Sequence, residues 1–162
     1  QGIGPEDVER IELRVHSLVL ELTGKKEPKD GLQGKFSVYH GCAVGLIHGR
    51  AGEEEFSDAM VNDPRVVALR NRVQAVVDDG IAEESVHVSA LLRDGRRVEV
   101  RVDHAIGSMH NPLSDAQLEA KFDALAVPLL GAQCSGRITE VCRTLAALPD
   151  LRTLTALTAP SA

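Results

Sequence analysis

Six histidines are the natural candidates for acid–base chemistry, because imidazole gains or loses a proton near neutral pH. One of them, His40, follows Lys35, Ser37 and Tyr39 at the start of an apolar, glycine-rich segment. Main-chain N–H groups at the start of a helix attract anions, so these four side chains form a candidate carboxylate site. The alternative is that Tyr39 belongs to the core and His40 is a hydrogen-bonded helix-start residue. Spacing alone favours that structural alternative.

His110 is the second histidine with a functional setting. It lies in a polar loop, residues 107–112, directly after a predicted strand, and such loops often carry functional side chains. For the other four histidines we expect structural or exposed positions: His16, His48, His87 and His104.

No motif in the sequence indicates a cofactor or a metal. The P-loop, GxGxxG, HExxH and GxSxG patterns are absent. Three cysteines, Cys42, Cys134 and Cys142, cannot all pair, and their spacing matches no CxxC motif. We therefore expect reduced thiols, no cofactor, no metal site and a cytoplasmic location.

Composition excludes several classes of protein. The chain has 162 residues, 43% of them hydrophobic and 26% charged, which is typical of one globular domain. A net charge of −6 disfavours a nucleic-acid partner, since a phosphate backbone attracts basic surfaces. No run approaches the roughly 20 apolar residues of a membrane span, so no membrane partner is expected.

Periodicity predicts a mixture of strands and helices. Strands are expected at 8–15, 73–77, 86–92 and 98–102, and the last two form a hairpin around Asp94-Gly95. Helices are expected at 16–22, 36–47, 53–60 and 64–72. This order predicts an α+β fold: two layers, with an antiparallel sheet of about four strands and helices on one face.

The remainder of the chain reads as helical. Ser114 and Gln117 form a capping box ahead of a helix whose end is disturbed by Pro128. Further helices are expected at 138–148 and after Asp150. We place an α+β domain at residues 1–130 and a helical C-terminal segment at residues 131–162, whose apolar side lacks a partner surface in this chain.

The ordered features of the sequence resemble the MmgE/PrpD family. They begin with Gly34-Lys35-Phe36-Ser37-Val38-Tyr39-His40-Gly41-Cys42-Ala43 and Leu46-Ile47-His48-Gly49. Asp63-Pro64-Arg65-Val66, the Arg93-Asp94-Gly95 turn, Gly107 with Asn111-Pro112-Leu113, and Lys121-Phe122 follow in order. The resemblance runs from about Val8 to Phe122.

The resemblance implies a 2-methylcitrate dehydratase-like lyase, a decarboxylase or an epimerase that acts on small polycarboxylates by metal-free acid–base chemistry. It implies that His40 is catalytic and that Lys35, Ser37, Tyr39, Gly107 and His110 bind substrate. In the family this region is a lid domain on a larger N-terminal helical domain. The chain, which starts at Gln1 without a Met, then resembles a fragment that is inactive alone and belongs to a homodimer.

A second function is compatible with the same residues. The Lys35–His40 cluster and the apolar C-terminal segment would equally serve a non-catalytic module that binds a small carboxylate or mediates dimerisation.

Overall fold

The computed structural model describes residues 2–158, which form two compact units. One unit ends at Asn111 and the other begins at Pro112. This division falls earlier than the domain boundary that the sequence places after residue 130. The reason is that helix α6 (Asp115–Leu130) packs against helix α7 (Ala132–Arg143). Among residues 2–158, no helix is long and apolar enough to span a membrane.

The first unit contains a four-stranded sheet in the order β2-β1-β3-β4. Its strands are β1 (Val8–Val15), β2 (Val73–Val77), β3 (Val86–Leu92) and β4 (Arg97–Val102). β1 pairs antiparallel with β3, and β3 pairs antiparallel with β4. β1 and β2 are parallel, with Ile11 beside Val73. The α+β class is confirmed, but the sheet is mixed rather than antiparallel, because the helical crossover between β1 and β2 returns the chain in the same direction.

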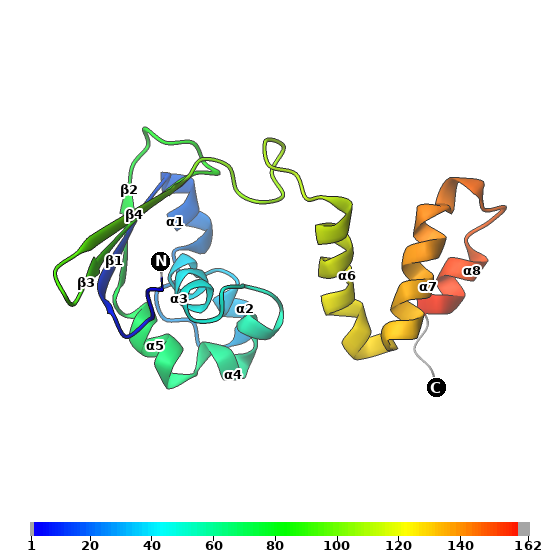
Figure 1. The fold of residues 1–162 in the computed structure, drawn as a ribbon, viewed down its shortest axis with the longest axis horizontal. Helices are drawn as coiled ribbons and strands as arrows, with labels where there is room; N and C mark the ends of the chain where they lie inside the picture. The colour runs from blue at the N-terminus through cyan, green and yellow to red at the C-terminus, as the bar shows by residue number, and fades with distance from the viewer. Residues whose placement is uncertain (1, 159–162) are drawn as a thin grey trace. The chain divides into compact units, whose positions relative to one another are not determined.

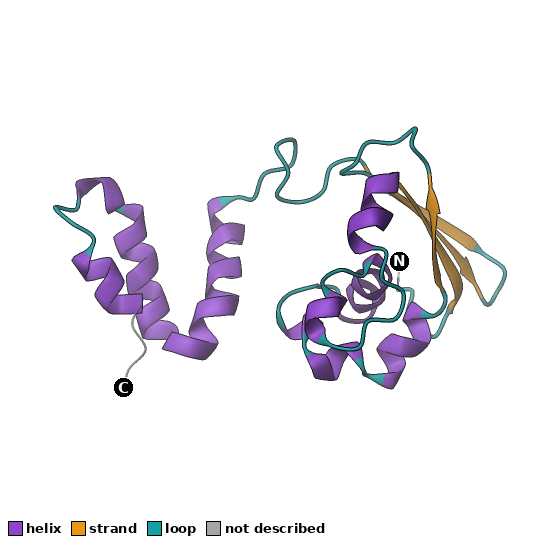
Figure 2. Cartoon of the chain, turned by 180° about the vertical axis from the view of Figure 1, so that it is seen from behind, coloured by secondary structure: helices purple, strands orange, loops and turns teal. Residues whose placement is uncertain are grey.

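Helices cover one face of this sheet (Figures 1 and 2). The helices on this side of the sheet are α1 (Ser17–Thr23), α2 (Gly31–Gly34), α3 (Val38–His48), α4 (Asp58–Val61) and α5 (Pro64–Arg70), with a 3-10 turn at Glu54–Phe56. α1 and α3 pack on the sheet and α5 joins its core, whereas α2 and α4 pack on each other and α4 packs on α5. Gly49 follows the last residue of α3 and caps the helix with a φ of 69°, which suits a residue without a side chain. The helix expected at 53–60 is broken, because Ser57 is extended and caps α4 with its side chain.

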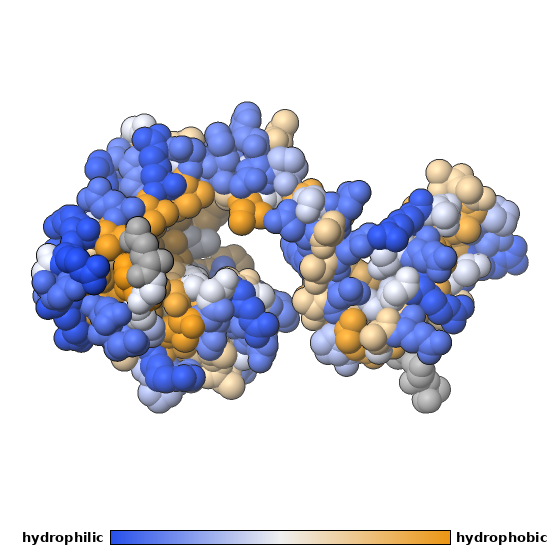
Figure 3. Space-filling model, in the orientation of Figure 1, coloured by the Kyte–Doolittle hydropathy of each residue, from blue (hydrophilic) through white to orange (hydrophobic). Residues whose placement is uncertain are grey.

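The core lies between the sheet and the helices. Val8, Ile11, Leu13 and Val15 project from β1 onto the helices. From the helical side the core receives Tyr39, Ala43, Val44, Val66 and Leu69. Apolar residues gather between the two layers in Figure 3. Almost all of this core is aliphatic, as a sequence with three Phe, one Tyr and no Trp requires.

The second unit is helical. It contains α6, α7, a 3-10 turn at Leu145–Ala147 and α8 (Arg152–Thr158). The predicted capping box is confirmed: the Ser114 hydroxyl accepts from the Gln117 N–H, and the Gln117 side chain accepts from the Ser114 N–H. Pro128 lies inside α6, which continues to Leu130. α7 starts at Ala132 and ends at Arg143, both earlier than the 138–148 helix expected there.

Candidate functional site

The start of α3 is fixed by Ser37. Its main chain is extended, and its hydroxyl accepts a hydrogen bond from the His40 N–H at 3.1 Å. This is the ordinary N-cap geometry, which satisfies one of the free N–H groups at the start of the helix. Ser37 itself is buried. Its hydroxyl therefore serves the start of α3.

The side chain of His40 is completely buried. Its Nε2–H donates to the main-chain oxygen of Glu55 at 2.8 Å, and its ring meets the Phe56 ring edge-on with 5.3 Å between centroids. Within residues 2–158 its Nδ1 has no hydrogen-bond partner. Burial lowers the pKa of His40 and the charge of Arg70 lowers it further, against the opposing effect of the Glu55 bond. Burial therefore favours the neutral form of this ring.

The residue whose main chain accepts this bond, Glu55, also has a buried carboxylate. Glu55 is 1% exposed, and its carboxylate accepts from the Arg50 Nε at 2.7 Å and from the Gly52 N–H at 2.9 Å. Burial alone would raise the pKa of Glu55, but the Gly52 and Arg50 bonds together hold it below its ordinary value. Arg50 also binds Glu54 at 2.6 Å. Hydrogen bonds to both the side chain and the main chain of Glu55 thus fix the segment after α3.

Arg70 makes the third buried polar anchor of this region. It is 6% exposed, and its Nη1 donates to the main-chain oxygen of Val61 at 3.0 Å. Burial lowers its pKa. His40 and Arg70 therefore hold the residues between α3 and α5 through main-chain oxygens, and the buried Glu55 carboxylate holds them through its contacts with Gly52 and the exposed Arg50.

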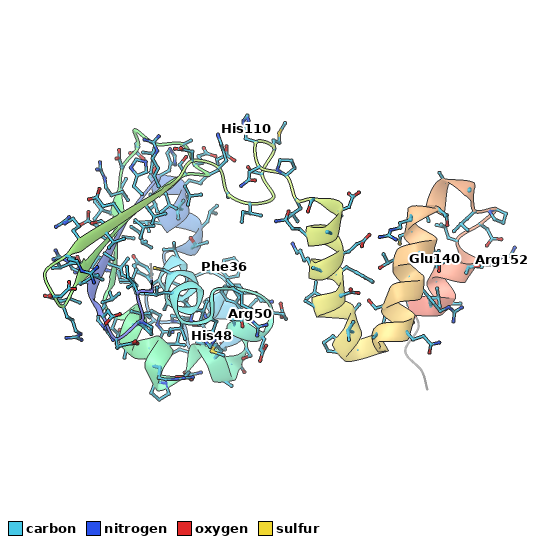
Figure 4. All side chains as sticks on the ribbon, viewed as in Figure 1. Phe36, His48, Arg50, His110, Glu140 and Arg152 are labelled. Atoms are coloured by element: carbon cyan, nitrogen blue, oxygen red, sulfur yellow. The ribbon has the colours of Figure 1, made fainter. Side chains whose placement is uncertain are left out.

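Lys35 and Phe36 are the accessible residues at the start of α3. The Lys35 ammonium contacts both carboxylate oxygens of Glu53, at 2.8 and 2.9 Å. Phe36 is 53% exposed, and Figure 4 shows Phe36 and Arg50 near the two ends of α3. A carboxylate ligand that reaches Lys35 must compete with Glu53 for the ammonium.

Tyr39 belongs to the core. It is 3% exposed, burial raises its pKa, and the Lys26 Nζ lies 5.9 Å from the centre of its ring. The lysine contact is a cation–π interaction at the rim of the core. The phenol ring therefore packs within the core.

The loop after β4 presents a second group of polar side chains. His104 Nδ1 lies 2.8 Å from a carboxylate oxygen of Glu84, and the rings of His104 and His110 lie 4.7 Å apart. Contact with His104 is the main cause of a lowered pKa at Glu84. Gly107 has a φ of 90°, and its N–H donates to the Asn111 oxygen at 2.7 Å, which closes the loop. His110 is exposed at this loop (Figure 4).

The structure separates the residues that the sequence groups together. Lys35 and His110 are open to solvent, and Gly107 shapes the loop that carries His110. Three of the predicted site residues are instead buried in the domain: Ser37, Tyr39 and His40. The sequence gives no sign of the buried Glu55 and Arg70, because a charged residue within a predicted helix is normally expected to face water. Within the described part of the chain, no group of three or more His, Cys, Asp or Glu residues could hold a metal ion.

Residues 1–146 match the MmgE/PrpD C-terminal domain. The chain belongs to the MmgE/PrpD family. The sequence resemblance is therefore confirmed over both the sheet-bearing unit and helices α6 and α7.

Two family relatives have activities in their names. The mitochondrial 2-methylcitrate dehydratase of Yarrowia lipolytica is 26% identical over 151 residues, covering 86% of this chain and 29% of the relative. The cis-aconitate decarboxylase of Homo sapiens is 26% identical over 155 residues, covering 93% of this chain and 32% of the relative. The chain thus spans about a third of the length of these MmgE/PrpD relatives.

Proposed function

We propose that this chain is the C-terminal part of an MmgE/PrpD lyase that acts on a small polycarboxylate by acid–base chemistry without a metal. The observation that carries the proposal is the match to a dehydratase and a decarboxylase over most of this chain. Both reactions can proceed through proton transfer at a carbon next to a carboxylate, where a positioned acid or base lowers the barrier. Positive or hydrogen-bonding groups would stabilise the charge that develops on the carboxylate.

The accessible side chains of this chain define its part in that proposal. Lys35 offers an ammonium to a substrate carboxylate, in exchange for Glu53. His110 offers an exposed imidazole on a loop closed by the Gly107–Asn111 bond. The buried His40 acts as a positioning residue, because it holds the main chain of Glu55 rather than facing a ligand. The proton-transfer groups then come from the part of the parent protein outside this chain.

The proposal predicts that the 162-residue chain alone turns over neither 2-methylcitrate nor cis-aconitate. In the full-length parent, Lys35→Ala and His110→Ala are expected to raise KM for the accepted substrate by about tenfold, as the loss of a charge-assisted hydrogen bond would. Lys29→Ala is the matched control for Lys35, because Lys29 is also an exposed lysine paired with a glutamate. Turnover by the isolated chain, or unchanged kinetics in both variants, would contradict the assignment.

A non-catalytic carboxylate-binding role is tested by the same reagents. If the parent is inactive on every small polycarboxylate but the isolated chain binds tricarballylate in a manner that Lys35→Ala abolishes, the binding module is the correct function.

The cytoplasmic location stays a prediction, which fractionation of the source cells would check.

A further inference from the structure

The outer edge of β4 is unpaired within residues 2–158. β4 is the last strand in the sheet order and pairs with β3 alone. A free edge of this kind presents main-chain N–H and C=O groups that readily pair with another strand. The strand also leaves apolar surface open, with Val100 55% exposed and Val102 37% exposed.

The side chains of β4 alternate strictly between charge and valine. Arg97, Glu99 and Arg101 lie on one face of the sheet. Val98 lies on the other face, where it packs against the hydrophobic core, and Val100 and Val102 share that face. Any strand that pairs with this edge must therefore match charges on one face and apolar groups on the other.

A second copy of β4 meets this requirement. In an antiparallel pair related by a two-fold axis at Val100, the two Val100 side chains face each other, and Val98 faces Val102 of the copy. On the charged face, Glu99 then lies opposite Arg101 of the copy, and Arg97 lies opposite Asp103. Every opposed pair in this register joins opposite charges or two valines.

Neighbouring registers do not have this property. An axis at Glu99 would set Arg97 opposite Arg101, and an axis at Arg101 would set Glu99 opposite Asp103. Like charges directly opposed across strands are destabilising. An axis at Val98 would run the pairing into the turn at residues 93–96. An axis at Val102 also sets Arg101 opposite Asp103 of the copy, but it carries Arg97 and Glu99 past the end of the strand. The register centred on Val100 therefore pairs the most opposite charges.

We propose that β4 is a self-recognition edge through which two copies of this chain form a continuous eight-stranded sheet, with Val100 on the two-fold axis. The interface is isologous, so it closes as a dimer and does not propagate. An edge of six residues buries less surface than the roughly 800 Å² that each partner buries in a stable complex. The dimer is accordingly weak. It is independent of the reaction proposed above.

Sedimentation velocity of the 162-residue chain over a concentration series tests the interface. Glu99→Arg and Arg101→Glu each place like charges opposite one another and are expected to weaken dimerisation at least tenfold. The double variant Glu99→Arg/Arg101→Glu restores opposite charges and is expected to recover the wild-type affinity. Glu9→Arg is the control, because it makes the same charge change at an exposed position of β1, away from this edge, and should have no effect.

Disulfide trapping provides a second measurement. In a Cys134→Ser/Cys142→Ser background, Val100→Cys should oxidise to a covalent dimer, since the two cysteines face each other on the axis. Val76→Cys, on exposed β2 at the opposite edge of the sheet, should remain largely monomeric. A wild-type chain that is monomeric at every concentration, a dimer insensitive to the single charge reversals, or a double variant that fails to recover would each overturn the proposal.

Discussion

The Nε2–H of His40 donates to the main-chain oxygen of Glu55 across 2.8 Å, although fifteen residues separate the two in the chain. The bond joins the buried first turn of α3 to the segment that precedes α4. Because the Glu55 carboxylate in turn binds Arg50 and Gly52, one imidazole is coupled to a network that fixes the whole connection.

Replacing His40 with Ala should strongly destabilise the first unit. The variant leaves a cavity and an unpaired buried oxygen at Glu55, for a loss of about 2–4 kcal/mol in the free energy of unfolding. Urea denaturation followed by circular dichroism measures the loss. His110→Ala is the control, because His110 is exposed and its removal should cost no more than about 0.5 kcal/mol. Equal stability of the two variants would show that the buried bond contributes nothing.

The same histidine should make stability depend on pH. Burial and the charge of Arg70 hold the folded-state pKa of His40 below its ordinary value of 6.5. The unfolded chain then binds more protons than the folded chain as pH falls through 6.5, so this contribution to stability is present above that pH and is lost below it. Urea midpoints at about pH 7.5 and about pH 5.5 should show the loss, and His40→Gln should reduce the difference. An unchanged pH dependence in His40→Gln would assign the effect to other groups.

Glu55 and Glu54 should respond differently to the same substitution. Both contact Arg50, but the Glu55 side chain is 2% exposed and the Glu54 side chain is 73% exposed. Glu55→Gln should cost about 1–2 kcal/mol, because it weakens buried hydrogen bonds with Arg50 and Gly52. Glu54→Gln should change stability by less than about 0.5 kcal/mol, as is usual for an exposed ion pair. Similar losses in a pair of denaturation curves would contradict the assigned burial.

Cysteine labelling should separate Cys42 from Cys142. Burial raises the pKa of the Cys42 thiol to about 11 from 9.0, which lowers its thiolate fraction at neutral pH by about a hundredfold. Cys142 is exposed. Brief treatment with iodoacetamide, followed by peptide mass spectrometry, should modify Cys142 and spare Cys42 until urea is added. Prompt labelling of Cys42 in the native protein would be inconsistent with its burial.

Local patterns allowed much of the fold to be predicted from sequence. The Ser114–Gln117 capping box, the Asp63-Pro64 helix start and the Asp94-Gly95 turn each depend on residues within four positions of one another. In each of these features the interacting residues are close together in the chain, so the interaction can be predicted without knowing the tertiary structure.

Features that depend on distant partners were not predictable in this way. The parallel pairing of Ile11 with Val73 depends on the path of the intervening helices, and the strand patterns are the same for either direction. His40 has the residue type of a catalytic group and the position of a ligand-binding helix start. Its burial depends on Glu55 and Phe56, which come from a segment that the sequence presents as an ordinary acidic helix turn.

The mixed sheet also fixes an order of events during synthesis. β1 occupies an interior position, yet both of its neighbours lie far along the chain, beginning at Val73 and Val86. While the chain emerges, β1 and the helices that follow it have no sheet to pack on, and their apolar faces stay in water. These non-local pairings close long loops, and the chain loses that entropy before the stabilising contacts form. This loss slows folding. Nascent chains that end before residue 102 therefore lack a complete sheet and are expected to require chaperone binding.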